Sequence, residues 1–217
     1  RSMRNLIFLA VPLLLSCAHN IDPATLRLAS RQDIEITNHD RLATPAMVKG
    51  ALADLAKVKK EKQAETLMIF LRENSEIFKI QAPEMELKLL RSDDDELGFT
   101  HYRYARLIKE VPVYGDELIL HVNNKSQLYM VNGQYHPTGL LDSEPALTAA
   151  KAGAIALEQG LAHKMESVEQ TALVFYPSGK ELRLAWHVTL RGGMAKWDYF
   201  VDAGDGRILF DQDRKRS

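Results

Sequence analysis

Residues Gly98–Gly133 read GFTHYRYARLIKEVPVYGDELILHVNNKSQLYMVNG, and this stretch decides the fold of the chain. From Phe99 to Ile108, apolar and polar side chains alternate and aromatic residues are frequent, as expected of a half-buried β-strand. The segments Glu117–Val122 and Gln127–Val131 predict two further strands, with asparagines supplying the turn between them. The stretch therefore predicts an antiparallel meander, which specifies no function by itself.

Two residues in the predicted strands indicate a particular backbone conformation, and the alternation of side chains defines the two faces of the first strand. Because proline has no backbone N–H to donate, Pro112 predicts a break or a sheet edge. Gly115 is suited to a bulge or a tight turn, since it lacks a Cβ atom. Tyr102 and Tyr104 share one face of the first strand, and His101 lies on the other face with its alternate neighbours.

The stretch resembles the core of the fungalysin/thermolysin propeptide domain, and the residues that match are His101, Arg103, Pro112, Gly115, His121 and Gly133. The resemblance extends from about residue 46 to residue 210. The resemblance implies that the chain acts as the intramolecular chaperone and inhibitor of a zinc protease. The chain departs from the family pattern at Ala105 and Arg106, where relatives usually carry glutamine, and at Glu110, where they carry glycine.

The N-terminus predicts export. Arg4 followed by the apolar run Leu6–Leu15 has the form of a signal peptide and is too short for an ordinary membrane-spanning helix. The run ends in Leu14-Leu15-Ser16-Cys17, which resembles a bacterial lipoprotein box and makes Cys17 the expected lipidation site. The alternative is an ordinary signal peptide cleaved after Ala18, leaving a secreted chain. Because Cys17 is the only cysteine, an internal disulfide is excluded.

The residues between the signal and the meander predict a polar lead and then helix. Residues 19–43 are polar and lack a clear period. Thr44-Pro45 has the form of a helix N-cap followed by proline at the first helical position. Apolar residues then recur at helical spacing across Val48–Val58 and Ala64–Phe78. A short strand is expected at Glu86–Leu90, before an acidic loop.

A second unit follows residues 137–145, whose two prolines and one glycine predict a linker. Thr148 has the form of a helix N-cap, with Leu147 placed to pack on Ala152. Four strands in two hairpins are expected after this helix, at Thr171–Tyr176, Glu181–Leu190, Trp197–Asp202 and Arg207–Phe210. This unit ends in WDYFVDAGDGRILF and resembles a PepSY domain.

The expected fold class is α+β, with two modules that each pack a helix on an antiparallel sheet in a cystatin-like plan. The expected boundaries are 1–18 for the signal peptide, 19–43 for the lead, 44–136 for the propeptide-like domain, 137–145 for the linker, 146–210 for the PepSY-like domain and 211–217 for a C-terminal tail.

Composition and motifs exclude several classes of function. The chain has 217 residues, a formal net charge of −1 and 46% hydrophobic residues, which suits one large or two small cores and argues against nucleic-acid binding. A thermolysin-like active site needs a His-Glu-x-x-His helix, and none of the seven histidines is followed by glutamate. The chain is therefore predicted not to be an enzyme and to need no cofactor, with zinc expected only in a partner catalytic domain.

Three weaker signals in the sequence each have an ordinary structural explanation. His101 and His121 can meet on neighbouring strands and hold a metal ion, but no third ligand is evident, so a structural role is favoured. The acidic run Asp93–Glu96 lacks the spacing of a calcium loop and predicts a solvated loop. Arg214-Lys215-Arg216 has the form of a processing site and equally that of a solvated tail.

Two functions of different classes remain, together with a third, weaker one, that of an envelope binding module unrelated to proteolysis. In the first, the chain is the propeptide of a thermolysin-like metalloprotease and fills the protease cleft with a polar, unstructured tail, formed by Asp211, Gln212, Asp213, Arg214, Lys215, Arg216 and Ser217. In the second, it is a free-standing envelope lipoprotein that binds a protease, or another partner, in trans. The lipoprotein box favours the second, because an anchored propeptide would be left behind after cleavage.

Overall fold

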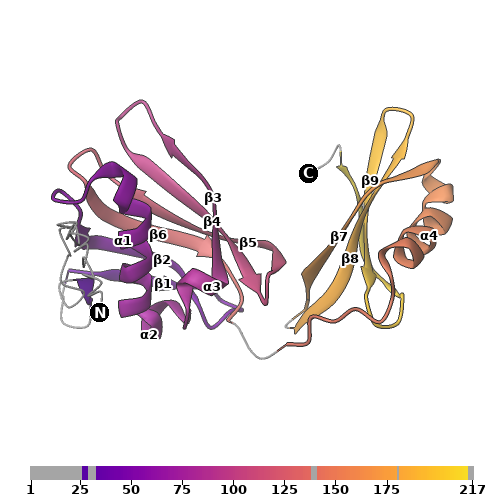
Figure 1. The fold of residues 1–217 in the computed structure, drawn as a ribbon, viewed down its shortest axis with the longest axis horizontal. Coiled ribbons are helices and arrows are strands. Elements are labelled where there is room, and N and C mark those ends of the chain that lie inside the picture. Colours follow the sequence, from indigo (N-terminus) through magenta and orange to yellow (C-terminus); the bar gives the residue numbers. More distant parts are fainter. Residues whose placement is uncertain (1–25, 29–32, 138–140, 180, 215–217) are drawn as a thin grey trace, which may run out of the picture.

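The fold is α+β in the computed structural model, which describes residues 26–28, 33–137, 141–179 and 181–214 (Figure 1). The helices are α1 (Lys60–Glu73), α2 (Ser75–Phe78), α3 (Pro83–Glu86) and α4 (Ala149–Gly160). The strands are β1 (Glu35–Asn38), β2 (Pro45–Asp54), β3 (Leu87–Asp94), β4 (Thr100–Ile108), β5 (Val111–Val122), β6 (Gln127–Gln134), β7 (Ser167–Ser178), β8 (Glu181–Gly192), β9 (Ala195–Asp202) and β10 (Ile208–Asp213). Cys17 and Lys215–Ser217 lie outside the described residues, and no described helix has the length and apolar character needed to cross a membrane.

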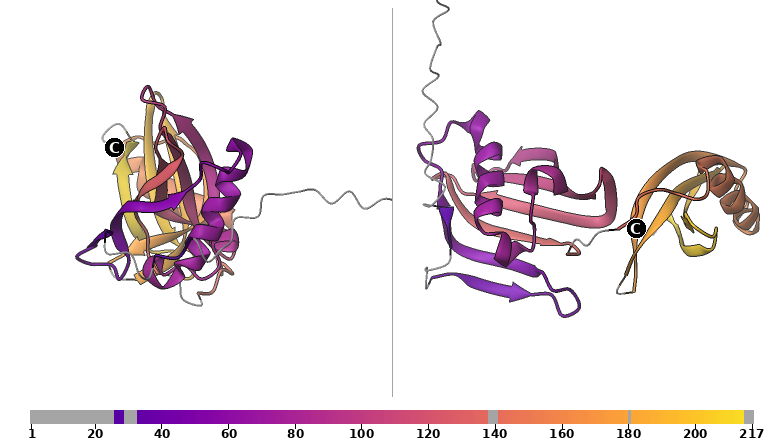
Figure 2. Two further views of the ribbon diagram at one scale, coloured as in Figure 1. Left: turned by 90° about the vertical axis from the view of Figure 1, so that its left-hand side faces the viewer. Right: turned by 60° about the horizontal axis from the view of Figure 1, so that its bottom comes forward.

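The strands form two antiparallel groups that meet at one point. The first group has the order β1-β2-β6-β5-β4-β3, and the second has the order β7-β8-β9-β10. They are joined where Val113 of β5 pairs in parallel with Phe175 of β7. The helices α1, α2 and α3 lie with the first group, and α4 covers the face of the second group that points away from the first (Figures 1 and 2).

The predicted meander is confirmed as β4, β5 and β6, which pair in sequence order. Tyr102 and Tyr104 are buried, whereas their alternate neighbours are half exposed. No break occurs at Pro112, because β5 runs through it and pairs Pro112 with Leu107 of β4. Gly115 has φ +78° and lies within the register shift between β4 and β5, as a bulge requires.

The prediction of a helix from Thr44-Pro45 is wrong, since Pro45–Asp54 is the strand β2 between β1 and β6. The buried residues Val48 and Leu52 are four apart because the register against β6 shifts between them, and Gly50 has φ +141° in that interval. The Thr44 hydroxyl donates to the carbonyl oxygen of Tyr135 at 2.7 Å instead of capping a helix. The helix α1 starts only at Lys60.

Part of the expected polar lead takes part in the fold. Leu26 and Leu28 are buried with the main core, and the Asn74 side chain holds both of their backbones. Its Nδ2 donates to the carbonyl oxygen of Leu26 at 2.8 Å, and its Oδ1 accepts from the backbone N–H of Leu28 at 2.8 Å. The strand β1 also lies within residues 19–43.

The apolar core has separate centres and a buried junction. The largest cluster lies between α1 and the first strand group, around Leu67, Phe70 and Leu120. A smaller cluster lies under α4, whose N-cap is Thr148 as predicted. Where the two groups meet, Val113 packs with Phe175, so the junction is apolar and closed. The expected domain boundaries and the cystatin-like plan remain predictions.

Candidate functional site

The half-exposed side chains of β4, β5 and β6 form a polar surface, named here the motif face, with His101, Arg103, Glu117, His121 and Asn132 as members. All five lie on the side of the sheet opposite the buried tyrosines. On the buried side, the Tyr102 hydroxyl donates to Oε1 of Gln63 at 2.9 Å, and burial raises the pKa of Tyr102 to about 12. The motif face is therefore a solvent-accessible surface on a rigid support.

Two histidines of the motif face are in direct contact. His101 and His121 are register partners on β4 and β5, and their Nδ1 atoms lie 2.7 Å apart. His101 Nε2 lies 3.1 Å from Asp95 Oδ2, and His121 Nε2 lies 2.6 Å from Asn132 Oδ1. Burial lowers the pKa of His121. Among the described residues, no group of three or more His, Cys, Asp or Glu side chains is placed to hold a metal ion.

The remaining motif residues have identifiable structural surroundings. Arg103 and Glu117 form an ion pair across β4 and β5, with about a third of each side chain exposed. Gly133 on β6 lies so close to β5 that a Cβ atom there would lie 2.1 Å from the carbonyl oxygen of Glu117. This close approach gives a physical reason for glycine at position 133.

Two of the residues that depart from the family pattern, Arg106 and Glu110, lie at positions with a distinct structural environment. Arg106 continues the inward alternation of Tyr102 and Tyr104, and its buried guanidinium lies 2.6 Å from Oε2 of Glu86 on α3. That alternation was visible in the sequence and would have placed Arg106 inside. Glu110 has φ +69° in the β4–β5 turn, a left-handed conformation that favours glycine.

A second buried charge cluster lies beside the linker and was missed by sequence reasoning. Asp116 Oδ2 accepts a hydrogen bond from the backbone N–H of His136 at 2.6 Å, and Oδ1 lies 3.0 Å from His136 Nδ1. Burial raises the pKa of Asp116. The cluster fixes the end of β6 onto β5 at the point where the chain leaves the first strand group.

The C-terminal segment differs from the expected unstructured tail. The strand β10 does not end at Phe210 but continues to Asp213, paired with β9 as far as Trp197. Asp211 Oδ2 accepts from the Trp197 indole N–H at 2.9 Å, and the Gln212 amide donates to the hydroxyl of Tyr114, on β5, at 3.4 Å. The expected tail is therefore an edge strand up to Arg214 among the described residues.

A buried carboxylate anchors the end of this strand. Asp198 on β9 accepts hydrogen bonds from the Thr189 hydroxyl at 2.7 Å and from Arg214 Nε at 3.0 Å. His187 Nε2 lies 3.0 Å from Asp198 Oδ1 but does not form a hydrogen bond of good geometry. The His187 ring stacks on Phe200 with centroids 4.6 Å apart. The position at which the chain leaves Arg214 is thus fixed by side-chain contacts.

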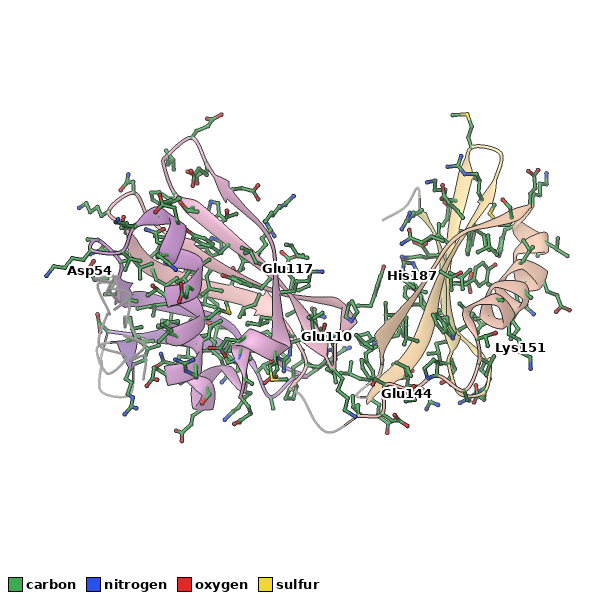
Figure 3. The ribbon with its side chains drawn as sticks, in the orientation of Figure 1. Asp54, Glu110, Glu117, Glu144, Lys151 and His187 are labelled. Atoms are coloured by element: carbon green, nitrogen blue, oxygen red, sulfur yellow. The ribbon has the colours of Figure 1, made fainter. Side chains whose placement is uncertain are left out.

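The anchored end lies on the side of the second strand group that faces the first. In Figure 1 the yellow strand β10 lies on this side, and its Gln212 contacts Tyr114 of β5. Figure 3 shows Glu110 at the end of the β4–β5 hairpin nearest the second group, and His187 on the face turned toward it.

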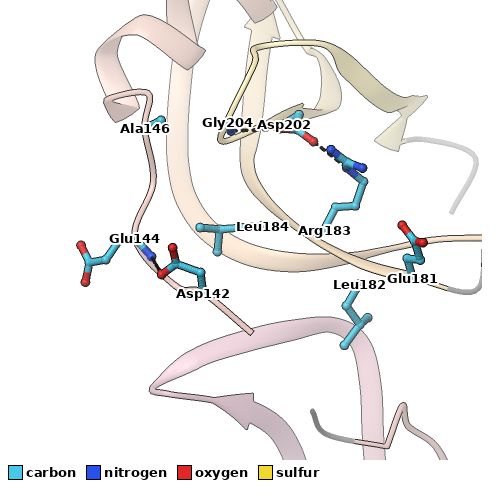
Figure 4. A pocket seen from close by; sticks show the side chains of 9 residues that line it. All are labelled: Asp142, Glu144, Ala146, Glu181, Leu182, Arg183, Leu184, Asp202 and Gly204. Carbon is cyan, nitrogen blue, oxygen red and sulfur yellow. Dashed lines mark hydrogen bonds and ion pairs between the residues drawn. The ribbon is translucent and has the colours of Figure 1, made fainter. Parts of the chain in front are cut away.

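A shallow pocket of about 300 Å³ lies between the linker and β8 and has an acidic lining (Figure 4). Its most buried carboxylate is already satisfied, since Asp202 Oδ2 accepts from Arg183 Nε at 2.7 Å and Oδ1 accepts from the backbone N–H of Gly204 at 2.9 Å. The most buried carboxylate of the pocket is therefore used in contacts within the fold.

Comparison with known proteins identifies a motif in the first strand group. The Fungalysin/Thermolysin Propeptide Motif matches residues 86–135, from the end of α3 through β6. Bacillolysin of Bacillus subtilis (strain 168) is 33% identical over 160 residues, which cover 67% of this chain and 30% of that protein. Thermolysin of Alicyclobacillus acidocaldarius is 31% identical over 196 residues, which cover 83% of this chain and 35% of that protein. The chain thus spans about a third of the length of these relatives.

Two solved structures are more distant. The Bacillus megaterium YpeB C-terminal domain matches 83% of this chain and 75% of its own length, with 12% identity and a TM-score of 0.40. A putative lipoprotein from Clostridium difficile 630 matches 65% of this chain and 91% of its own length, with 17% identity and a TM-score of 0.31.

Proposed function

We propose that this chain, which carries the fungalysin/thermolysin propeptide motif and is related to the propeptide region of thermolysin-like proteases, is the chaperone and inhibitor of such a protease. The observation that carries the proposal is the match of residues 86–135, because it covers the whole β3–β6 meander. The chain contains no His-Glu-x-x-His sequence, so the catalytic zinc belongs to the partner.

The inhibitory element in this proposal begins after Arg214. Residues 211–214 are held by β9, Tyr114 and Asp198, and thus are not free to enter a protease cleft without leaving β10. A short segment that follows an anchored strand stays at high effective concentration near a docked cleft, so that only its own residues remain to be ordered on binding. The strand groups would supply the affinity, and the segment would block the active site.

Inhibition of a thermolysin-like protease tests this proposal. The chain should bind the protease and reduce its peptidase activity, and deleting Lys215–Ser217 should weaken inhibition by roughly tenfold or more while changing binding much less. Binding is measured by calorimetry and inhibition with a peptide substrate on the same samples. Asp198→Asn should also weaken inhibition, because it loosens the anchor of Arg214.

The matched control is Asp205→Asn, which removes an exposed carboxylate paired with Arg207 in a turn of the same strand group. It should inhibit like the unmodified chain. If the truncated chain inhibits as well as the intact one, the segment does not occupy the cleft. If the intact chain does not bind the protease at all, the propeptide role itself is wrong.

The second candidate function is that of an envelope lipoprotein acting on a partner in trans, and the observation that favours it is Leu14-Leu15-Ser16-Cys17. If it is correct, the mature chain expressed in a bacterial host should begin at Cys17 and carry diacylglycerol, because lipidation precedes cleavage at such a box. Mass spectrometry of the mature N-terminus measures this. A chain that begins at His19 without lipid indicates secretion instead, and a chain that retains Met3 contradicts export of either kind.

A further inference from the structure

The contacts of the histidine pair on the motif face require more N–H donors than two neutral imidazole rings carry. Asp95 Oδ2 lies 3.1 Å from His101 Nε2. The pKa of Asp95 is lowered chiefly by the backbone N–H of Phe99, so the carboxylate is ionised and can only accept. His101 therefore carries a hydrogen on Nε2.

The other ring faces a second acceptor. His121 Nε2 lies 2.6 Å from Asn132 Oδ1, and an amide oxygen only accepts, so this nitrogen also carries a hydrogen. The two Nδ1 atoms are 2.7 Å apart, which two facing lone pairs do not tolerate without a hydrogen between them. The contacts thus require three hydrogens on two imidazoles, one more than two neutral rings hold.

We propose that His101 and His121 form a proton-bound pair, which takes up one proton and is driven apart by a second. In the neutral form the Asn132 amide turns over, so that its Nδ2 donates to His121 Nε2 while His121 Nδ1–H donates to His101 Nδ1. Uptake of one proton at His121 Nε2 returns the amide oxygen to that position, and the shared hydrogen then moves to His101 Nδ1, so that the positive charge lies on His101 beside Asp95 and His121 stays neutral. A second proton would place two Nδ1–H groups and two positive charges against each other, and the rings must then separate.

The charges around the pair favour the first proton and oppose the second. Asp95 touches His101, and Asp94 at the end of β3 is held by Lys60 of α1. Asp93 is the register partner of His101 on β3. These carboxylates stabilise a single positive charge on the pair.

Beyond His121 the surroundings are less favourable to charge. Arg103 lies along the same face of β4 and lowers the pKa of His121, although Glu117 on β5 partly neutralises it. From β6, Tyr129 packs its ring 6.1 Å from His121, and burial raises the pKa of its hydroxyl, which keeps it neutral. Among the described contacts, β4, β5 and β6 therefore supply no further carboxylate that could stabilise a second proton on the pair.

A transition-metal ion is the other cation that two imidazoles can hold. With metal–nitrogen bonds of about 2.0–2.1 Å at usual coordination angles, the two nitrogens must be about 3 Å apart or more. The observed 2.7 Å suits a shared hydrogen better, and Asp95 lies on the outer nitrogen of His101 instead of between the rings. The distance therefore favours the proton.

The pair makes the motif face sensitive to acid. Once the first proton is held on His101 beside Asp95, the folded state favours a neutral His121, because burial lowers the pKa of His121 below the ordinary value of 6.5. This contribution to the free energy of unfolding is fully present above pH 6.5 and is lost as the pH falls through the lowered pKa of His121. His101, His121, Asp95 and Asn132 all lie within residues 86–135, so the groups that respond to acid belong to the propeptide motif. This inference concerns the chain alone and does not depend on the proposed function.

Nuclear magnetic resonance of the imidazole nitrogens in the full chain tests the pair directly. Between pH 8 and pH 4.5, the pair should titrate in two steps at least about one pH unit apart, and His121→Gln should leave a single step for the remaining ring. His101→Gln should do the same for His121. Two rings whose titration curves are unchanged by loss of the neighbour would overturn the proposal.

Thermal unfolding gives an independent measurement. Between pH 7.5 and pH 5.0, the unmodified chain should lose about 3 °C more in Tm than His121→Gln. His163→Gln is the matched control, because His163 is an exposed histidine that stacks on Trp197 in the second strand group, and it should behave like the unmodified chain. Parallel losses in the unmodified chain and in both pair variants would overturn the proposal. Binding of one Zn²⁺ per chain at micromolar concentration, abolished in both pair variants, would assign the site to a metal ion instead.

Discussion

Replacing Glu86 by alanine is expected to destabilise the chain by about 3–5 kcal/mol, because it removes the carboxylate that faces a buried guanidinium. Arg106 is fully buried, and its Nη2 lies 2.6 Å from Glu86 Oε2. Glu86 Oε1 also accepts from the backbone N–H groups of Gln81 and Ala82, so the start of α3 loses its cap as well. Urea unfolding followed by circular dichroism measures the change.

The same helix supplies the control. Glu84 lies two residues earlier on α3 and pairs with Arg72, but both side chains are 46% exposed. Glu84→Ala should change the free energy of unfolding by no more than about 1 kcal/mol. Adding Arg106→Met to Glu86→Ala should restore part of the lost stability, since the buried charge is then gone. If the double variant is as unstable as the sum of its parts, the buried charge is not the cause.

Replacing Gly133 by alanine is expected to lower the free energy of unfolding by about 3 kcal/mol, because the added methyl group would clash with backbone atoms of a strand that is paired on both sides. The Cβ atom would lie 2.1 Å from the carbonyl oxygen of Glu117 and 3.0 Å from Leu118 Cα. Both atoms belong to β5, the central strand of the first group, which is paired on its other side with β4. The substitution must therefore push β6 away from β5.

Gly153 on α4 is the matched control for this effect. A Cβ atom there would lie 3.4 Å from Val168 Cγ2, an ordinary contact, and alanine is a better helix former than glycine by about 1 kcal/mol. Gly153→Ala should therefore be neutral or stabilising in the same unfolding experiment. If Gly133→Ala is equally harmless, the two strands are not held as close as the structure places them.

The sequence by itself determined the meander β4–β6 and the helix α4, because the residues that specify these elements are close together in the chain. The alternation across β4 gives its buried and exposed faces directly, and the asparagines after Val122 supply the turn into β6. Thr148 caps α4 as predicted, since its side chain accepts from Lys151 N two residues into the helix. In each case the residues that stabilise the element are neighbours in the chain.

Only the tertiary structure decided that residues 45–54 form β2 and that residues 211–213 continue β10. The Thr44-Pro45 segment carries a local helix signal, yet it is a strand because β1 and β6 offer hydrogen bonds on both sides. Residues 211–214 carry no strand pattern in the sequence, yet they are held in place because Trp197, Tyr114 and Asp198 form hydrogen bonds with them. These partners lie far away in the sequence. Hydrogen bonds and burial supplied by distant strands outweigh a local preference of about 1 kcal/mol, and no local pattern records where such partners will be.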